Sequence, residues 1–381
     1  MKILLAPDSF KDCLSAAEVA NYLAEGIKRV NPHITIRSIP LADGGEGFVE
    51  TMLSIKEGTP ISCRVTDPLG REIDSRYGMV DNGQTAVIEM AAASGIELLK
   101  PEDRNPLITS TRGTGQLMKD AMQRGCRKLI IGIGGSATND GGTGMARALG
   151  YRYLNQHKQE IPEGGGYLGQ LHHIDQSSVF PLLKKTEIVA ACDVNSPLTG
   201  PRGASAVYGP QKGATPAMVS QLDQNLEHLA KIIQQELQLT VAELPGGGAA
   251  GGLGAGLVAF AGATLRTGFS IISEQTGLEQ AIQEADWVFT GEGRIDHQTK
   301  QGKTPWGVAQ LARKHNKPCI GIAGLLGDRY HELYHEGFSS LFALPNGPLS
   351  FEESLAQAPG LIADTAEQVF RLITSYTSPN G

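Results

Sequence analysis

The segment that most constrains the fold is residues 128–144, where an apolar run leads directly into a loop of glycines and hydroxyl residues. Lys128-Leu129-Ile130-Ile131 is typical of a buried strand, and Gly132-Ile-Gly-Gly-Ser-Ala-Thr-Asn-Asp-Gly-Gly-Thr-Gly144 follows it. Glycines let backbone N–H groups approach an anion, and a helix after the loop would direct its positive end to the same place. The order strand, glycine-rich loop, helix predicts an α/β fold with an anion site at one edge of the sheet.

Three further segments repeat this glycine-rich pattern: Ala42–Gly47, Pro245–Gly252 and Thr290–Asp296. Glycine makes up 48 of the 381 residues, against a usual share of about 7%. The excess is concentrated in these short stretches, so low sequence complexity does not explain it. Several such loops in one chain indicate a site that surrounds phosphate groups and a metal ion.

The spacing of apolar residues predicts how the chain is divided. A strand at 2–6, a helix at 16–30 and a strand at 34–41 open the chain, and strands at 287–290, 318–323 and 339–344 end it. Between them, the turns around residues 67–70 and 81–83 predict an antiparallel meander over 61–90. Both chain ends are therefore expected to complete one open parallel sheet, with the middle of the chain inserted as a second domain.

Composition and charge exclude several classes of protein. The net charge is −7 and no basic run is present, which argues against nucleic acid or an anionic membrane as a partner. No apolar stretch reaches the roughly 18 residues of a membrane span, and the first apolar run is too short for a signal peptide. The five cysteines are scattered and never paired as C-x-x-C, which favours small buried thiols in a reducing compartment. We expect a cytoplasmic protein.

Three short motifs are typical of other classes of protein. Two of these classes stay open as alternatives, and the third is excluded. Gly132-x-Gly134-x-x-Ala137 matches a dinucleotide fingerprint, although residues 155–160 show no strand ending in the required acid. The segment from His331 to His335 matches the H-E-x-x-H pattern of zinc hydrolases in a short polar context. Gly302-Lys303-Thr304 matches only the end of a Walker A loop, because His297 stands where that motif needs glycine.

Acidic and basic residues in the predicted loops indicate phosphoryl transfer. Acidic side chains that lie close together repel one another, and Mg²⁺ or a nearby cationic side chain would relieve this repulsion. Backbone N–H groups and a few lysines are the other parts of a phosphoryl-transfer site. The acids are Asp8, Asp43, Glu46, Asp140, Asp193, Glu292 and Asp296, and the cations are Lys11, Arg112, Lys212 and Lys303.

At these residues the chain resembles the bacterial glycerate kinase family, type I. The resemblance covers nearly the whole chain in order and rests on the blocks Ala6–Lys11, Ala42–Gly47, Ser110–Gly115, Gly132–Gly144, Cys192–Val194, Gly209–Ala214, Gly248–Gly252, Thr290–Asp296 and Gly302-Lys303. It departs from the family pattern at Phe48, where threonine is usual, at Arg112, where an aromatic residue is usual, and by one inserted residue within Asn195–Leu198.

The resemblance implies an α/β fold with a Rossmann-like parallel sheet domain built from both chain ends, residues 1–88 plus 285–381. An inserted second α/β domain would span residues 89–284, with the active site in the cleft between the two. The implied reaction is ATP- and Mg²⁺-dependent phosphorylation of D-glycerate to 2-phosphoglycerate in glycerate, glyoxylate or aldarate carbon metabolism. Phosphorylation at the 3-position is the alternative, and the expected assembly is a monomer or homodimer.

The resemblance also suggests roles for individual residues. Asp193 or Asp8 would orient and deprotonate the hydroxyl group, Arg112 or Lys11 would bind the substrate carboxylate, and Lys212 would stabilise the transferring charge. Nucleotide contacts are expected at Gly134, Gly135, Ser136, Asn139, Asp140, Gly291, Glu292, Gly293 and Lys303. Substrate contacts are expected at Ser9, Ser110, Arg112 and Gly113. Mg²⁺ would be held by acids among Asp8, Asp43, Glu46 and Asp296.

Overall fold

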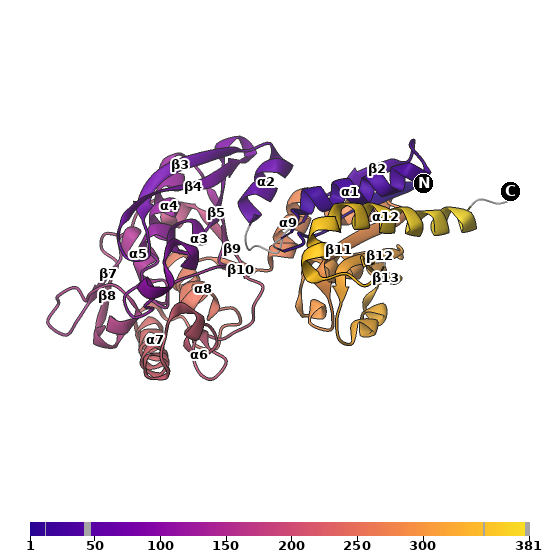
Figure 1. The fold of residues 1–381 in the computed structure, drawn as a ribbon. Helices are drawn as coiled ribbons and strands as arrows, with labels where there is room; N and C mark the ends of the chain where they lie inside the picture. Colours follow the sequence, from indigo (N-terminus) through magenta and orange to yellow (C-terminus); the bar gives the residue numbers. More distant parts are fainter. Residues whose placement is uncertain (12, 42–46, 346, 378–381) are drawn as a thin grey trace. The chain divides into compact units, whose positions relative to one another are not determined.

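The computed structural model describes residues 1–11, 13–41, 47–345 and 347–377. The chain forms two compact units (Figure 1). Unit 1 consists of Met1–Asp43 and Phe269–Gly381, and unit 2 consists of Gly44–Gly268. Both units combine a largely parallel sheet with helices, which confirms the predicted α/β class. No helix in the described ranges combines the length and apolar character that a membrane span requires.

Unit 1 is built on a five-stranded, wholly parallel sheet with the order β13-β12-β11-β1-β2. Its strands are β1 (Lys2–Leu5), β2 (Thr35–Ser38), β11 (Trp287–Ile295), β12 (Cys319–Leu326) and β13 (Ser340–Ala343). This confirms the prediction of one Rossmann-like sheet from both chain ends. From β1 the chain proceeds to β2 on one side, whereas the later strands lie on the other side, so the strand order reverses between β1 and β11.

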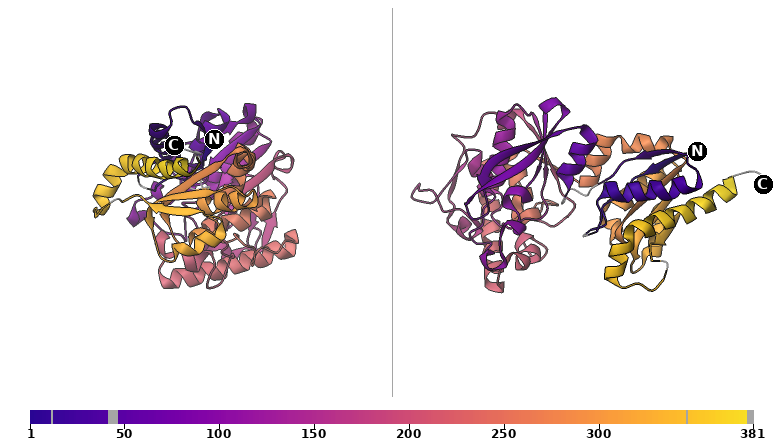
Figure 2. Two further views of the ribbon diagram at one scale, coloured as in Figure 1. Left: turned by 90° about the vertical axis from the view of Figure 1, so that its right-hand side faces the viewer. Right: turned by 45° about the horizontal axis from the view of Figure 1, so that its top comes forward.

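The helices of unit 1 cover this sheet with apolar faces. They are α1 (Ala16–Val30), α9 (Gly268–Thr276), α10 (Leu278–Glu284), α11 (Thr304–Lys314) and α12 (Phe351–Thr377). Helix α1 begins at the predicted capping box of Ser15 and Glu18. It packs against α12, and the two helices run side by side in the views of Figure 2. Together with β1 and β11 they bury a core that includes Leu5, Leu23 and Phe370.

Unit 2 contains a six-stranded mixed sheet with the order β10-β9-β6-β5-β4-β3. Its strands are β3 (Thr59–Thr66), β4 (Glu72–Val80), β5 (Thr85–Glu89), β6 (Lys128–Gly132), β9 (Glu187–Ala191) and β10 (Thr264–Arg266). Strands β3, β4 and β5 form the predicted antiparallel meander, and β5, β6, β9 and β10 are parallel. A separate small sheet pairs β7 (Arg152–Leu154) with β8 (His173–Asp175).

The helices of unit 2 are α2 (Phe48–Lys56), α3 (Ala91–Ser94), α4 (Arg112–Gln123), α5 (Thr143–Ala148), α6 (Ala204–Tyr208), α7 (Pro216–Leu237) and α8 (Ala249–Ala261). The apolar stripe of α7 packs into the core, as its helical spacing predicts, and Leu222, Leu226 and Leu229 are buried.

The boundaries between the two units differ from the predicted domain boundaries at residues 88/89 and 284/285. Strand β5 pairs in parallel with β6, with Ile88 opposite Ile131, so the meander extends the sheet of unit 2. Helix α10 packs against α11 and β1, so it belongs to unit 1. Strand pairing and helix packing therefore place the boundaries at 43/44 and 268/269.

The glycines of residues 290–296 lie in a strand, so the expectation of a loop there is wrong. Strand β11 continues to Ile295 and pairs with β12, with Gly291 opposite Ile322. A Cβ atom on Gly291 would lie 2.0 Å from the carbonyl oxygen of Ile322. Glycine is needed here because a neighbouring backbone approaches closely.

The glycine-rich stretch that begins at residue 245 is also not an open loop. Residues 249–257 are buried in the first turns of α8. Gly251 has φ +68°, and a Cβ atom there would lie 1.9 Å from the carbonyl oxygen of Thr138. The Gly251 carbonyl accepts a hydrogen bond from the Gly141 N–H at 3.0 Å. These glycines let α8 pack backbone to backbone against the loop that follows β6.

Candidate active site

The predicted site residues lie in both units. Unit 2 carries Ser110, Arg112, Gly113, Gly134, Gly135, Ser136, Asn139, Asp140, Asp193 and Lys212, and unit 1 carries Asp8, Ser9, Lys11, Gly291, Glu292, Gly293, Asp296 and Lys303. Asp43 and Glu46 lie outside the described residues. Many of these residues stand just beyond the carboxyl end of a parallel strand, which is where α/β sheets bind ligands.

The loop after β6 exposes only its first glycines. Gly134 and Gly135 are exposed, Gly135 has φ +71°, and the chain is buried from Ser136 onward. Within the described part of the chain, no acceptor pairs with the backbone N–H groups of Gly134, Gly135 and Ser136. Three successive free N–H groups are suited to bind an anion.

Lys212 lies beneath this loop and is only 1% exposed. It ends the 3-10 helix Pro210–Lys212, and its Nζ donates to the Ser136 hydroxyl at 2.6 Å and to the Thr138 carbonyl at 2.7 Å. Burial lowers the pKa of Lys212 to about 7, against the opposing effect of Asp140. Because the Ser136 oxygen accepts from Lys212, its own O–H is available to donate to a ligand.

The buried side chain of Asp140 holds the same loop in place through hydrogen bonds. Its carboxylate is fully buried and accepts from the N–H and hydroxyl of Thr111, both at 2.8 Å, and from the N–H groups of Gly142 and Gly144, both at 3.1 Å. Burial raises the pKa of this carboxyl, and the hydrogen bonds oppose the rise. The start of α5 is thus already bound by a carboxylate. The expectation that α5 directs its positive end at a ligand is wrong.

Asn139 and Thr138 carry polar atoms that no described residue satisfies. The Asn139 Oδ1 accepts from the Ser205 hydroxyl at 3.2 Å. Its Nδ2 and the Thr138 Oγ1 are buried and have no hydrogen-bond partner among the described residues. A nucleotide contact by Asn139 or Asp140 stays a prediction.

Ser110 and Arg112 are bound by Glu163, a residue that the sequence did not point to. The Glu163 carboxylate accepts from the Arg112 guanidinium, with Nε at 2.7 Å, and from the Ser110 hydroxyl at 2.7 Å. Burial acts to raise the pKa of Glu163, but the hydrogen bonds from Arg112 and Ser110 outweigh it and lower the pKa below its usual value. Glu163 lies in a polar, irregular stretch with no motif, so no local signal could have identified it.

Gly113 is packed against another backbone. A Cβ atom there would lie 2.1 Å from the carbonyl oxygen of Thr66, and the residue is buried. This close approach gives the glycine a packing role at the start of α4.

Asp193 follows β9 and is half-buried. Its carboxylate accepts from the backbone N–H of Gly268, with Oδ1 at 3.1 Å and Oδ2 at 3.4 Å. The contact joins the loops after β9 and β10 at the carboxyl edge of the sheet.

In unit 1, Glu292 and Lys303 form an ion pair at the end of β11. The Glu292 Oε2 accepts from Lys303 Nζ at 3.0 Å, and its Oε1 accepts from the Thr299 hydroxyl at 2.9 Å. Burial raises the pKa of Glu292, with Lys303 opposing. Lys303 stands immediately before α11.

Asp296 forms a second ion pair beside the first. It accepts from Arg294 Nε at 2.9 Å and from the N–H of Gln298 at 2.8 Å. Burial acts to raise the pKa of Asp296, but these hydrogen bonds hold it below its usual value. Its own N–H donates to the Thr299 hydroxyl at 3.1 Å, which connects the two pairs.

The loop after β1 adjoins this cluster. The Asp8 N–H donates to the Gly291 carbonyl at 2.8 Å, and the Asp8 carboxylate accepts from the Ser9 N–H at 2.7 Å. A Cβ atom on Gly293 would lie 3.6 Å from the backbone nitrogen of Lys11. Lys11 is exposed. The structure therefore brings together the two unit 1 segments that carry predicted site residues.

The predicted Mg²⁺ ligands lie only partly in the described chain, because Asp43 and Glu46 are outside it. No three histidine, cysteine or acidic side chains gather within the described residues in a way that could hold a metal ion. Asp296, one of the predicted ligands that the structure describes, is paired with Arg294. The metal site stays a prediction.

The structure does not provide the geometry that a zinc hydrolase site or a dinucleotide-binding fingerprint requires. His331 and His335 lie in the 3-10 helix Tyr330–Glu336 and are exposed. Residues three apart align in such a helix, so a four-residue spacing does not bring two imidazoles together. For the dinucleotide fingerprint, α5 begins only at Thr143, beyond Ala137, and β7 lies in a separate antiparallel sheet. A Rossmann fingerprint needs a helix at once and a parallel strand next.

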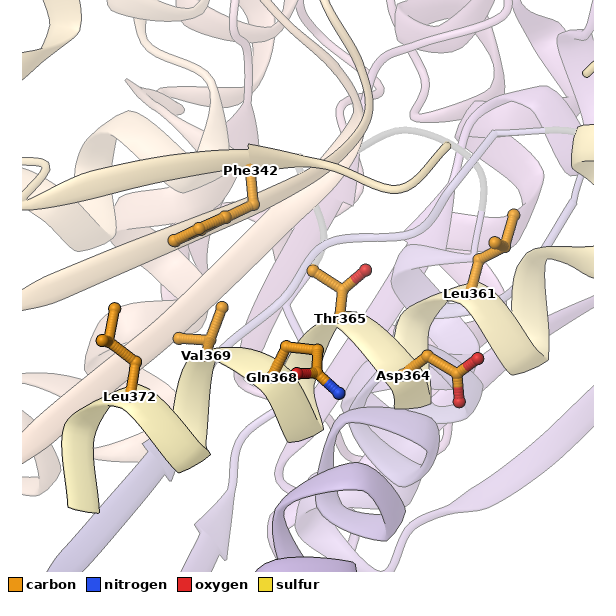
Figure 3. A pocket seen from close by; sticks show the side chains of 7 residues that line it. All are labelled: Phe342, Leu361, Asp364, Thr365, Gln368, Val369 and Leu372. Atoms are coloured by element: carbon orange, nitrogen blue, oxygen red, sulfur yellow. The ribbon is translucent and has the colours of Figure 1, made fainter. Parts of the chain in front are cut away.

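A pocket of about 330 Å³ lies in unit 1 between β13 and α12 (Figure 3). It is lined by Phe342, Leu361, Asp364, Thr365, Gln368, Val369 and Leu372. Its lining is mainly apolar and includes none of the predicted site residues. It is therefore separate from the candidate site.

Comparisons with known proteins agree with the motifs. The model of the glycerate kinase family matches residues 3–374. A glycerate kinase from Bacillus subtilis (strain 168) is 48% identical over 97% of this chain and 97% of its own length. A glycerate 2-kinase from Escherichia coli (strain K12) is 48% identical over 90% of each chain. A solved structure from Salmonella typhimurium LT2, described as a candidate glycerate kinase 2, matches with a TM-score of 0.88 and 46% identity over 98% of both chains.

Proposed function

The chain belongs to the glycerate kinase family, and we propose that it transfers the γ-phosphoryl group of ATP to the 2-hydroxyl of D-glycerate, giving ADP and 2-phosphoglycerate. The observation that carries this proposal is the group formed by the buried Lys212 and the N–H groups of residues 134–136, which no described residue accepts from. Phosphoryl transfer is accelerated mainly by positioned donors and cations around the transferring charge. The glycerate 2-kinase name of the Escherichia coli relative favours the 2-position over the 3-position.

The donor set of the loop after β6 fits an anionic phosphoryl group. It offers backbone N–H groups, the Ser136 hydroxyl and the Lys212 ammonium, all of them donors. Magnesium ATP, when bound, supplies the phosphoryl group and neutralises part of its charge. In our proposal Gly134, Gly135, Ser136 and Lys212 stabilise the charge that develops on transfer. Lys212 is held at this position by the Ser136 and Thr138 oxygens.

The acceptor hydroxyl needs a carboxylate close to it. Asp193 and Asp8 are the candidates, because each follows a parallel strand at its carboxyl end. The proposed base orients the 2-hydroxyl of glycerate and accepts its proton as the new P–O bond forms. The contact of Asp193 with the Gly268 N–H supports it as an oriented carboxylate.

The substrate carboxylate needs a cation that the protein has not already paired. The Arg112 guanidinium is bound to Glu163, whereas Lys11 is exposed beside Asp8 and Ser9. This favours Lys11 over Arg112 as the carboxylate-binding group. Asp43, Glu46 and Asp296 remain the proposed Mg²⁺ ligands, and the location of the active site between the two units stays a prediction. The cytoplasmic location and the monomeric or dimeric state also stay predictions.

The test is a coupled ADP-release assay with D-glycerate, with and without Mg²⁺, followed by ³¹P NMR of the product. We expect ADP release that depends on both glycerate and Mg²⁺, and a phosphorus signal coupled to the proton on carbon 2. A signal coupled to the carbon 3 protons would instead establish the 3-kinase. Absence of glycerate-dependent ADP release would contradict the proposal.

A further inference from the structure

Helix α11 begins at the place in unit 1 where α/β sheets most often bind ligands. The strand order reverses between β1 and β11, and β11 leads through residues 296–303 into α11. Ligands bind beyond the carboxyl ends of strands at such a reversal. The arrangement is a strand, a loop and Gly302-Lys303-Thr304 at the start of a helix, with Gly302 at φ +108°.

The amino end of α11 is left open, unlike those of the two longer helices of unit 1. Helices α1 and α12 begin with side-chain caps, from Ser15 and Ser350. Lys303, the residue before α11, makes no cap. Among the described residues, nothing accepts from the N–H groups of Thr304 and Trp306. The first turn therefore presents unpaired donors and the positive end of an 11-residue helix.

A buried hydroxyl at the same turn is also unsatisfied. Thr304 is 0% exposed, and its Oγ1 has no hydrogen-bond partner in the described structure. Buried hydroxyl groups in native proteins are almost always paired. An unpaired one at the first position of an uncapped helix indicates that a ligand atom completes it.

The charges nearby favour an anion as that ligand. The two carboxylates of the cluster are already neutralised, Glu292 by Lys303 and Asp296 by Arg294. The remaining groups at the turn are donors: two N–H groups, one hydroxyl and the other hydrogens of the Lys303 ammonium. A group rich in acceptor oxygens matches this set of donors.

We propose that the first turn of α11, with Lys303 and Thr304, binds a phosphate group of the nucleotide, and that Glu292 is a positioning residue that holds Lys303 toward it. The proposal rests on the proposed kinase function for the identity of the nucleotide. The sequence led us to expect that Glu292 contacts the nucleotide itself. In this proposal Glu292 instead holds Lys303 in position. Thr304 and Trp306 are added to the site by the structure alone.

Binding of ADP and of inorganic tripolyphosphate, measured by calorimetry, tests the site without turnover. Lys303→Gln and Thr304→Val should each weaken both ligands at least tenfold. Lys300→Gln is the matched control, because Lys300 lies in the same loop but is paired with Glu332; its affinities should stay within twofold. Thr304→Ser should restore binding, which a purely structural role of the methyl group would not do.

Trp306 gives a local signal, because it lies in the first turn of α11 and the chain has only one other tryptophan, Trp287. Tripolyphosphate should change the fluorescence of Trp306 and should not do so in Trp306→Phe. For Glu292, we expect Glu292→Ala to raise the KM for ATP with kcat nearly unchanged, and Glu292→Gln to recover most of the loss.

The outcomes separate this proposal from the proposed function. A protein that phosphorylates glycerate, with unchanged ADP and tripolyphosphate affinity in folded Lys303→Gln and Thr304→Val, would overturn the α11 site and leave the kinase intact. A protein that fails to phosphorylate glycerate but binds tripolyphosphate through Lys303 and Thr304 would retain the site and remove the kinase function.

Discussion

Lys212 and Ser136 are 76 positions apart in the chain, yet the lysine Nζ lies 2.6 Å from the serine hydroxyl in a buried hydrogen bond. The same ammonium binds the Thr138 carbonyl. A single lysine side chain thus fixes the part of the loop after β6 that carries the N–H groups of residues 134–136. The donors of the proposed site are therefore positioned before any ligand arrives, which is the condition for electrostatic stabilisation of a transferring group.

The buried lysine should give stability a characteristic pH dependence. Burial lowers the pKa of Lys212 from 10.5 to about 7. Between these values the unfolded chain binds more protons than the folded one, so this residue makes the folded state more stable as pH rises. We expect the free energy of unfolding of wild type minus that of Lys212→Met to rise with pH by up to about 1.4 kcal/mol per unit.

Urea denaturation between pH 7 and pH 10 measures this difference. Lys231→Met is the control, because Lys231 is an exposed helical lysine paired with Glu227. The difference in free energy of unfolding between wild type and Lys231→Met should hardly vary with pH. Parallel stability curves for wild type and Lys212→Met would show that Lys212 keeps an ordinary pKa in the folded protein.

Gly251 in α8 and Gly262, which follows the last residue of α8, should respond differently to the same substitution. Gly251 and Gly262 have φ of +68° and +64°, so alanine at either position costs roughly 1–2 kcal/mol of backbone strain. Only at Gly251 would the new Cβ collide with a backbone atom, the Thr138 oxygen at 1.9 Å. Overpacking of this kind adds roughly 1–3 kcal/mol.

Thermal unfolding of Gly251→Ala and Gly262→Ala compares the two costs directly. Because the Thr138 oxygen is also an acceptor for Lys212, Gly251→Ala should lower kcat as well, and Gly262→Ala should not. Equal melting temperatures for the two variants would mean that α8 can move away from the loop without cost.

The sequence predicted the elements of the fold well because their signals are local. The apolar run before Gly132 and the capping box at Ser15 each concern residues close together in the chain, and both appear as expected. The return of strands and helices near the C-terminus correctly predicted that both chain ends share one sheet. What the sequence could not provide is which individual atoms of distant segments come into contact.

Glycine shows this limit most clearly. A glycine that lets a ligand approach and a glycine that lets another backbone approach look the same in a sequence. Gly291 and Gly251 are of the second kind, since Ile322 and Thr138 from distant segments occupy the space of their missing side chains. For the same reason Asp140 could be recognised as a loop acid but not as the buried acceptor that caps α5.

Glu163 should contribute to stability through the groups it holds. Glu163→Ala leaves the Arg112 guanidinium and the Ser110 hydroxyl without their partner, and such losses cost about 1–3 kcal/mol. Glu160→Ala breaks surface pairs with Arg152 and Arg147 and should cost less than about 1 kcal/mol. Chemical denaturation of both variants checks the difference, and a smaller loss for Glu163→Ala would contradict it.

Lys11 and Arg112 can be separated by their effect on substrate affinity. If the exposed Lys11 binds the glycerate carboxylate, Lys11→Gln should raise the KM for glycerate at least tenfold and leave the KM for ATP nearly unchanged. Arg112→Gln, which removes a group already bound to Glu163, should alter the KM for glycerate less than threefold. Steady-state kinetics with each substrate varied in turn would reveal the reverse pattern if Arg112 leaves Glu163 to bind the substrate.

Asp193 should matter for turnover far more than for stability. Asparagine keeps one oxygen that can accept from the Gly268 N–H but cannot take a proton from the substrate hydroxyl. Loss of a general base lowers rates by roughly 10²–10⁴-fold, so kcat of Asp193→Asn should fall at least a hundredfold, with a melting temperature within a few degrees of wild type.

The matched control is Asp223→Asn, because Asp223 makes the same kind of contact, with the Gly200 N–H at 3.0 Å, and is not among the candidate site residues. Its kcat should equal that of wild type. If Asp193→Asn keeps a normal kcat, the carboxylate of Asp193 only joins the loops after β9 and β10, and Asp8 becomes the remaining candidate for the base. If both variants lose activity together with stability, the asparagine substitution disturbs the backbone contact itself, and removal of a proton acceptor is not the cause.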